Sequence, residues 1–344
     1  MNYPFGERES RLSSMKKFLI FLLICMVGLA VAFSCFYQKF QELDQPVKAN
    51  ARAVIYKVEQ GATLRSLGTD LERRGLLRSA HVFEFWGRYL KSGHLIKAGY
   101  YSLSAAMSPR EILQLIVEGH TASKVVTFPE GLTLKECATI VEKNKIGTAQ
   151  EFLHLTTTQG KKYGNLFPDN MEGYFLPDTY TLPLDCDVEL LVRTVAEHFK
   201  ETVLPYHTKK SPLSLYDTII LASLVEREAQ VASERPVIAG VYINRLNDGI
   251  KLECDATVQF ALGYQKEFLL YKDLEIDSPY NTYKYAGLPV GPICNPGIES
   301  IKAACSPTPS HYYYYVRNDV KGDGSHVFGQ NFREHENNIR KYQL

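Results

Sequence analysis

"LASLVEREAQVASERPVIAGVYINRL", residues 221–246, combines the repeat of a buried helix with two closely spaced acids. Projected at about 100° per residue, Glu228 falls at the centre of the apolar stripe, where a leucine would be expected. Glu226 projects to the other side, which is expected to be more hydrated. The pattern predicts that the whole stretch is helical, with the part after Pro236 continuing as a second helix. It also predicts that one carboxylate is directed into the interior.

A carboxylate removed from water has a raised pKa, because burial disfavours the charged form. A carboxylic acid that keeps its proton near neutral pH can act as a general acid. The alternative is a structural Glu228 bonded to a neighbouring helix or paired with Arg235 or Arg245, since such pairs also perturb pKa values. Both interpretations remain open at this level.

The composition is that of an ordinary globular protein. The chain has 344 residues, which is long enough for two domains. Of these residues 45% are hydrophobic and 22% charged, a composition that does not indicate disorder. Its net charge of +1 offers no electrostatic basis for binding nucleic acid. A nucleic-acid partner is therefore not expected.

An uncharged apolar segment, "FLIFLLICMVGLAVAFSCFY", occupies residues 18–37 and is long enough to cross a bilayer as a helix. Basic residues are slightly more numerous before it than after it, and Lys16 and Lys17 adjoin it directly. We therefore expect a cytoplasmic N-terminus (1–17), a transmembrane helix (18–38), a linker (39–52) and an exported remainder. A cleaved signal peptide is the alternative, but its apolar region is usually shorter.

The cysteines give no metal or redox signature. Seven are present, and no two have C-x-x-C spacing, so small buried residues are the expected role. The nine histidines contain no H-E-x-x-H motif, and His326 and His335 are expected to be structural or peripheral to the cleft. We predict no cofactor and no metal site.

A strand–turn–helix unit occurs twice. "VEQGATLRSLGTDLERRGLL" (58–77) aligns with "FPEGLTLKECATIVEKNKI" (128–146), each with a turn glycine and a threonine suited to cap a helix. The region 53–120, with a second helix and the strand "AGYYSL", resembles the LysM-like module of exported cell-wall proteins. That resemblance implies binding to amino-sugar polymers, whereas a small α/β packing unit is the alternative.

The segment "NMEGYFLPDTYTLP" (170–183) gathers aromatic rings and prolines around Glu172 and Asp178. Sugar rings stack on exposed aromatic faces, so one interpretation is a glycan-binding loop. The other is an ordered loop that supports the core. Near the C-terminus, four consecutive tyrosines (312–315) predict a strand with two buried and two exposed rings.

Four stretches together resemble the YceG-like endolytic murein transglycosylases: 222–246, "DATVQFALG" (255–263), "SPYNTYKYAGLPVGPICNPGIESIKAA" (278–304) and "EGYFLPDTY" (172–180). The resemblance extends from the apolar segment to the C-terminus. It implies an α+β fold made of a transmembrane helix, a small LysM-like α/β module and a larger mixed α+β catalytic domain (121–344).

The same resemblance assigns the catalytic role to the second glutamate of the E-x-E pair, which is Glu228 here. It also implies that Asn244, Asp255, Tyr280 and Asn281 position sugar hydroxyls or hold Glu228, with turn capping as the alternative for each. Two positions depart from the family pattern: Ala256 replaces a proline in the D-P-T-V motif, and Val290 replaces the second proline of G-L-P-P-G. With Asp255 as the helix cap, these departures are expected to alter loop stability rather than activity.

The implied activity is endolytic cleavage of the β-1,4 bond between N-acetylmuramic acid and N-acetylglucosamine in nascent glycan strands, leaving 1,6-anhydro ends and limiting strand length. The implied location is the bacterial inner membrane, single-pass, with a periplasmic catalytic domain and peptidoglycan synthases as partners. One alternative is a muramidase that hydrolyses the bond, with Glu226 or Asp255 as its second carboxylate. Another is a non-catalytic peptidoglycan-binding scaffold. A serine or cysteine hydrolase lacks a G-x-S-x-G elbow and an evident Cys/His pair.

Overall fold

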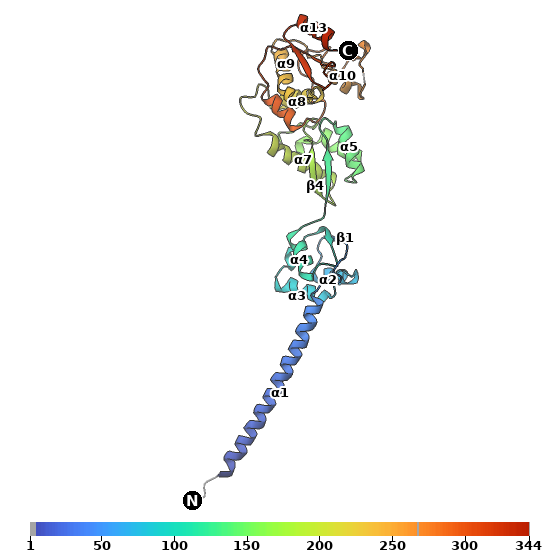
Figure 1. The fold of residues 1–344 in the computed structure, drawn as a ribbon. Coiled ribbons are helices and arrows are strands. Elements are labelled where there is room, and N and C mark those ends of the chain that lie inside the picture. The colour runs from blue at the N-terminus through green and yellow to red at the C-terminus, as the bar shows by residue number, and fades with distance from the viewer. Residues whose placement is uncertain (1–4, 267, 344) are drawn as a thin grey trace. The chain divides into compact units, whose positions relative to one another are not determined.

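The computed structural model describes residues 5–266 and 268–343, with side chains from Leu22 onward. The fold mixes α-helices with three two-stranded sheets, which confirms the predicted α+β class (Figure 1). The chain divides into two compact units. Unit 1 runs to Lys124 and includes Pro183–Asp185, and unit 2 comprises Val125–Leu182 and the chain from Cys186 onward.

Unit 1 begins with the long helix α1 (Phe5–Leu43). Its stretch Leu22–Leu43 is apolar and long enough to cross a membrane, by length and composition. The helix passes the predicted end of the span at residue 38 and takes in the first part of the predicted linker. Residues after Leu43 bond to the rest of unit 1, for example through the Lys48 N–H to the Ala105 carbonyl at 3.0 Å.

The rest of unit 1 is built as strand, two helices, strand and a further helix. The elements are β1 (Val54–Val58), α2 (Leu64–Arg73), α3 (Ala80–Tyr89), η1 (Gly93–Leu95), β2 (Gly99–Leu103) and α4 (Pro109–Glu118). β1 and β2 pair antiparallel, with Tyr56 opposite Tyr101, around a core that includes Leu71, Phe83 and Leu103. The element order agrees with the sequence expectation, while the LysM-like identity of the module stays a prediction.

The two copies of the repeat begin their helices in the same way. Gly61 and Gly131 adopt positive φ values of 79° and 76° in the turn, a region that favours glycine. Thr63 and Thr133 then cap their helices, each in a capping box. Ser108 caps α4 in a third box with Glu111. These short-range patterns were readable because each depends on residues three positions apart.

Unit 2 packs its helices around one hydrophobic core (Figure 1). Its elements are β3 (Ser123–Phe128, which begins at the unit boundary), α5 (Leu134–Lys143), α6 (Ala149–Thr158), η2 (Gly160–Tyr163), β4 (Asp178–Pro183), α7 (Val188–Val203), α8 (Leu215–Glu228), η3 (Ala232–Glu234), α9 (Arg235–Asn247), α10 (Asp255–Leu262), α11 (Tyr271–Leu274), α12 (Ile298–Cys305), β5 (Tyr314–Arg317), β6 (His326–Gly329) and α13 (Phe332–Tyr342).

Helix α8 lies at the centre of this core. Every residue from Thr218 to Val225 is buried, so the helix is enclosed on all sides rather than along one stripe. The sequence predicted helix from 221 to 246, but α8 ends at Glu228, and Ala229 adopts an extended ψ of 111°. Pro236 stands in the first turn of α9, where its missing N–H has no intrahelical partner to lose. The break places Glu228 at a helix end.

The aromatic segment 170–183 supports the core. Tyr174 and Phe175 are 1% and 0% exposed, so neither ring offers a face to a sugar. The carboxylate of Glu172 accepts the Leu134 N–H at the start of α5, at 3.0 and 3.1 Å, and the Asn295 amide at 3.1 Å. The glycan-binding interpretation of these rings is therefore wrong, and the core-supporting one holds.

Burial raises the pKa of Glu172 from 4.5 to about 8, although the Leu134 and Asn295 hydrogen bonds act in the opposite direction. The folded state therefore holds a proton that the unfolded chain releases between these two pH values. The free energy of unfolding should fall as pH rises from about 4.5 to about 8, by on the order of 5 kcal/mol from this group, and then level off.

Glu172→Gln should remove much of this pH dependence, whereas Glu142→Gln, at an exposed position of α5, should preserve it. Urea denaturation of the purified chain at several pH values measures both. An unchanged slope in Glu172→Gln would contradict a proton held at this site.

β5 and β6 form an antiparallel hairpin, with Tyr315 opposite Phe328. All four tyrosines of the run 312–315 are half-buried, so the predicted division into two buried and two exposed rings is wrong. Of the four, only Tyr314 and Tyr315 belong to the strand. Helix α13 packs against β5, and the end of α9 bonds to the backbone that leads into it.

Candidate active site

Glu228 is the last residue of α8 and is only partly accessible. The helix starts at Ser214, whose hydroxyl accepts the Asp217 N–H at 3.1 Å, and then runs through the core. The chain leaves the helix at Ala229, directly after Glu228. The carboxyl group is desolvated, while the residue as a whole is partly exposed.

Two donors hold the two carboxylate oxygens of Glu228. The Cys254 thiol donates to Oε1 at 3.2 Å, and the Tyr315 hydroxyl donates to Oε2 at 3.1 Å. Behind Tyr315, the hydroxyl of Tyr242 lies 2.8 Å from the Tyr315 hydroxyl, and the two rings meet edge to face. The carboxyl plane is therefore held by Cys254, which stands at the cap position of α10, and by Tyr315 of β5. Tyr242 of α9 supports Tyr315 in turn.

Burial raises the pKa of Glu228 above its ordinary value of 4.5, and the negative charge of Asp255 acts in the same direction. Hydrogen bonds from Cys254 and Tyr315 and the nearby His326 partly oppose this effect. Burial is the largest contribution, so the protonated form is favoured beyond the usual range of a glutamate.

The arginines that the sequence offered as partners of Glu228 serve other groups. Arg235 donates to the Ser300 hydroxyl at 3.0 Å, and Arg245 donates to the Tyr313 carbonyl at 2.6 Å and pairs with Glu253 at 3.1 Å. Within the part of the chain that the structure describes, no Lys or Arg forms an ion pair with Glu228. The structural ion-pair alternative therefore does not hold.

Glu226 is not the hydrated acid that the projection suggested. Its side chain is 8% exposed, and Oε2 accepts the Gly297 N–H at 3.0 Å and the Ser300 hydroxyl at 2.7 Å at the start of α12. The projection failed because α8 is covered on every side, here by α12. The E-x-E pair thus divides two roles: Glu226 fastens the end of α8 to α12, and Glu228 faces the cluster described above.

We expect Glu226→Ala to lower the free energy of unfolding by about 2 kcal/mol or more, because the Gly297 and Ser300 donors lose their acceptor. Glu226→Gln keeps one acceptor oxygen and should cost less. Glu299→Ala, which removes an exposed acid of α12, should stay within about 0.5 kcal/mol of the wild type. Chemical denaturation measures all three, and equal losses in Glu226→Ala and Glu299→Ala would contradict the fastening role.

Of the four predicted substrate residues, Asn244 is committed to the backbone. Its amide N–H groups donate to the Ser310 and Tyr312 carbonyls, both at 2.9 Å. Together with Arg245, it holds the chain that leads into β5 and so helps to place Tyr315.

Asn281 is 0% exposed, and its amide donates to the Leu274 and Ile276 carbonyls at 2.8 and 2.9 Å. It therefore orders a turn and has no surface to offer a sugar. Tyr280 is half-buried against Phe260, with ring centroids 4.7 Å apart.

Asp255 is the one member of the four whose charge acts on Glu228 directly. It is exposed and accepts the Tyr283 hydroxyl at 2.5 Å. It was predicted to cap its helix, but Cys254 occupies the cap position and Asp255 is the first helical residue. The helix forms with Ala256 in place of the family's proline.

Cys254 and Tyr315, the two residues that hydrogen-bond to Glu228, were not singled out from the sequence. Cys254 precedes a motif that was recognised, and Tyr315 was noted only as part of a strand. They lie 26 and 87 residues from Glu228 along the chain, and no local periodicity reports contacts of that kind. His326 was expected to be structural: its side chain is buried, bonds to Glu234 at 2.8 Å and packs against Tyr315 at 5.3 Å.

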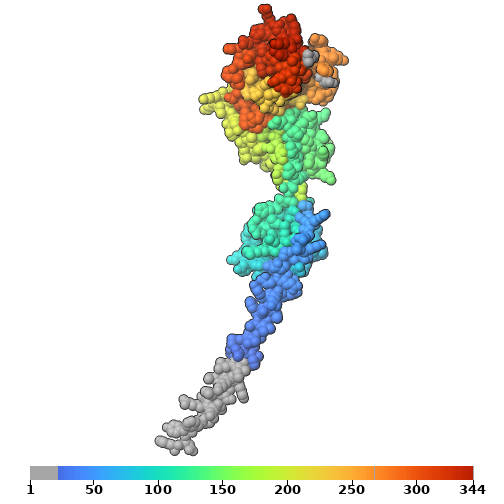
Figure 2. Space-filling model, in the orientation of Figure 1, coloured from blue at the N-terminus to red at the C-terminus, as the bar shows by residue number. Residues whose placement is uncertain are grey.

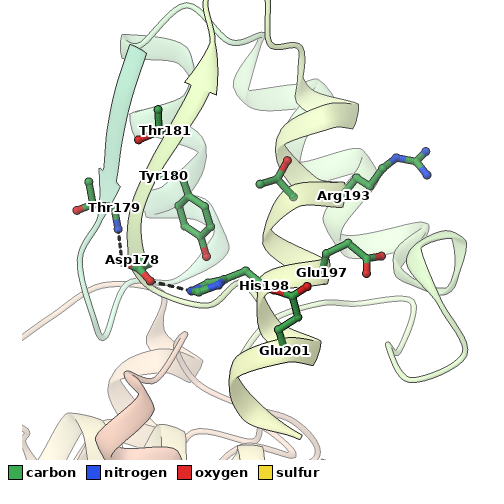
Figure 3. Close-up of a pocket in the computed structure, with 9 residues that line it drawn as sticks. Asp178, Thr179, Tyr180, Thr181, Arg193, Glu197, His198 and Glu201 are labelled. Atoms are coloured by element: carbon green, nitrogen blue, oxygen red, sulfur yellow. Dashed lines mark hydrogen bonds and ion pairs between the residues drawn. The ribbon is translucent and has the colours of Figure 1, made fainter. Parts of the chain in front are cut away.

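Asp178 lies elsewhere, in an open groove of about 490 Å³ between β4 and α7 (Figure 3). The His198 ring lies 2.7 Å from the Asp178 carboxylate, and Glu197 and Glu201 border the same groove. Among the described residues, no group of three or more His, Cys, Asp or Glu side chains is arranged to hold a metal. Cys254, Cys294 and Cys305 are buried free thiols.

A desolvated carboxyl group of raised pKa, hydrogen-bonded by a thiol and a hydroxyl, is a candidate general acid. A family model described as the YceG-like family matches residues 56–341. The chain belongs to the YceG-like family.

Relatives and one solved structure agree with this assignment. The endolytic murein transglycosylase of Bacillus subtilis is 31% identical over 88% of both chains. That of Streptococcus pneumoniae serotype 2 is 28% identical over 96% of this chain and 66% of its own length. A crystal structure of a YceG-like protein from Listeria monocytogenes is 30% identical, with a TM-score of 0.56 over 84% of this chain and 99% of that chain. These relatives place the chain among the lytic transglycosylases, which are lyases.

Proposed function

We propose that this chain is an endolytic murein transglycosylase that cuts the β-1,4 bond between N-acetylmuramic acid and N-acetylglucosamine in nascent glycan strands. The observation that carries the proposal is Glu228, a partly exposed residue whose carboxyl group has a pKa raised by burial and two oxygens oriented by Tyr315 and Cys254. Such a group can give a proton near neutral pH and take one back.

In the first step, protonated Glu228 donates its proton to the glycosidic oxygen as the bond from that oxygen to the anomeric carbon of the muramic residue breaks. The anomeric carbon gains oxocarbenium character, and the leaving strand ends in a new hydroxyl group. The hydrogen bonds from Tyr315 and Cys254 stabilise the carboxylate that remains.

In the second step, the Glu228 carboxylate removes the proton from the hydroxyl on carbon six of the same muramic residue. That oxygen bonds to the anomeric carbon and closes the 1,6-anhydro ring, so no water is consumed and Glu228 regains its proton. Because the nucleophile belongs to the substrate, it is already tethered, which replaces the second carboxylate that a hydrolase needs.

The segment between α10 and Cys294 is the proposed location of sugar contacts. It carries exposed rings, with Tyr264, Tyr271 and Tyr285 at 56%, 92% and 47% exposure, and exposed tyrosine faces suit pyranose rings. Asp255 joins this segment to the site through its hydrogen bond with Tyr283. Asp255 and Tyr280 would orient the sugar, whereas Asn244 and Asn281 would act by holding the surrounding loops.

The apolar part of α1 supports the proposal that the protein is anchored in the cytoplasmic membrane with unit 2 outside it. Substrate strands emerging from synthases at the membrane would then be within reach. Cutting them would limit glycan strand length, and peptidoglycan synthases are the proposed partners.

The mass of the products tests the reaction type. Purified full-length chain is incubated with uncrosslinked glycan strands, and the new ends are analysed by mass spectrometry. Anhydro ends weigh one water less than hydrolysed ends, so anhydro products are expected, and exclusively hydrated products would establish the muramidase alternative instead. Tight strand binding without any new ends would favour the non-catalytic scaffold.

A further inference from the structure

In unit 1, a groove of about 590 Å³ lies between the C-terminal end of α1 and helix α3. Phe33, Phe36 and Phe40 form its wall on α1, and Val82, Phe85 and Trp86 form its wall on α3. In the space-filling view, the visible part of α1 and the module above it form one continuous surface (Figure 2). The groove plays no part in the chemistry of unit 2.

The two walls are fastened to each other. The Trp86 indole N–H donates to the Asp44 carboxylate at 2.7 Å, and the Phe40 and Phe85 rings meet edge to face at 5.1 Å. Arg78 donates to the Pro46 carbonyl at 3.0 Å, directly after α1 ends. The module is thus held at a defined height on α1 rather than joined to it by a free linker.

That height coincides with the edge of the predicted span. Phe33 and Phe36 lie within residues 18–38, and Phe40 follows Tyr37 by three residues, or about 4.5 Å of helix. The headgroup layer is about 5–8 Å thick on each side of the hydrocarbon core. The Phe40, Phe85 and Trp86 rings therefore fall in the interfacial layer, where tryptophan and tyrosine are enriched.

The open side of the groove is apolar and uncovered. Phe36, Phe85 and Tyr89 are 68%, 46% and 69% exposed, and Tyr89 stacks on Phe85 at 6.0 Å. Arg88, at the polar edge of α3, is exposed and reaches back to Glu84 at 2.6 Å. Lys39, on the α1 side of the groove, places a long cation beside these rings, a combination that suits acyl chains and phosphates at a membrane surface.

We propose that acyl chains of outer-leaflet phospholipids fill this groove, so that the α3 face of the module lies on the membrane. Lipid is the expected occupant because the α1 wall of the groove continues the apolar segment that lipid would surround. The inference rests on the proposed membrane anchor. It adds a second, interfacial contact that holds the module close to where α1 leaves the bilayer.

Trp86 is the only tryptophan of the chain, so it reports on this contact without labelling. The full-length chain is reconstituted into phospholipid nanodiscs whose lipids carry bromine near the headgroup end or near the methyl end of their acyl chains. We expect Trp86 to lose about half of its emission with bromine near the headgroup end, and less with deep bromine or with aqueous acrylamide.

Phe85→Ser combined with Tyr89→Ser should weaken the bromine quenching, while Val54→Ser combined with Ile55→Ser, at exposed apolar positions of β1, should preserve it. Emission that bromolipid does not quench would overturn the proposal. Quenching by acrylamide alone would show a hydrated groove, and quenching by neither would show that another protein segment, such as a partner's transmembrane helix, fills it. Failure of the chain to enter nanodiscs would overturn the anchor itself, and glycan cleavage, measured separately, would be unaffected by either result.

Discussion

Replacing Glu228 by glutamine is expected to reduce cleavage of uncrosslinked glycan strands by about a thousandfold or more, because one group supplies both the acid and the base of the reaction. Glutamine has almost the same shape and still offers an acceptor to Cys254 or Tyr315, but it neither gives nor takes a proton. The measurement is the rate of appearance of new anhydro ends with purified full-length chain.

The fold of the Glu228→Gln variant should persist, and its free energy of unfolding near neutral pH should equal or exceed that of the wild type, because glutamine is neutral in both states and so does not favour the unfolded chain by ionising there. Glu226→Gln is the matched control on the same helix end and should keep most of the activity, since Glu226 contacts α12 and not the cluster around Glu228. Wild-type rates in Glu228→Gln would disprove the proposed mechanism.

Replacing Tyr315 by phenylalanine is expected to move the alkaline limb of the rate–pH profile upward by about one pH unit and to reduce the maximal rate by about tenfold. The Tyr315 hydroxyl donates to Glu228 and so lowers the pKa of that carboxyl group. Without it the carboxyl holds its proton to higher pH, which shifts the limb upward, while the loss of orientation and carboxylate stabilisation slows turnover.

Cys254→Ser provides a comparison of opposite sign. A hydroxyl donates more strongly than a thiol, so this variant should lower the pKa of Glu228 and move the same limb downward. Profiles of kcat/KM against pH distinguish both variants from a merely destabilised protein, in which the rate would fall without a shift. Two unshifted limbs would show that Glu228 does not govern the profile.

Much of the local architecture was predictable because it depends on neighbours within one helical turn. The capping boxes at Ser108 and Thr133, the repeated strand–turn–helix unit and the long apolar helix all follow from such patterns. The helical periodicity also indicated Glu228 as an acid directed into the interior. That prediction agrees with the raised pKa, since one face of a helix can be read from its own sequence.

Contacts between distant segments were not predictable in the same way. The surroundings of Glu226 were misjudged because α12, more than 70 residues later, covers the side of α8 that the projection left to water. The rings at 174 and 175 looked suitable for sugars but are enclosed, whereas Tyr264, Tyr271 and Tyr285 are exposed.

The sequence by itself determined several of the helices and where they begin, and it indicated which acid of the E-x-E pair stands in an apolar helix face. Only the tertiary structure decided that α8 ends at Glu228 and that Cys254 and Tyr315 hold its two oxygens. The physical reason is range: periodicity and capping act over a few residues, whereas the environment that sets a pKa is assembled from segments that meet only when the core is packed.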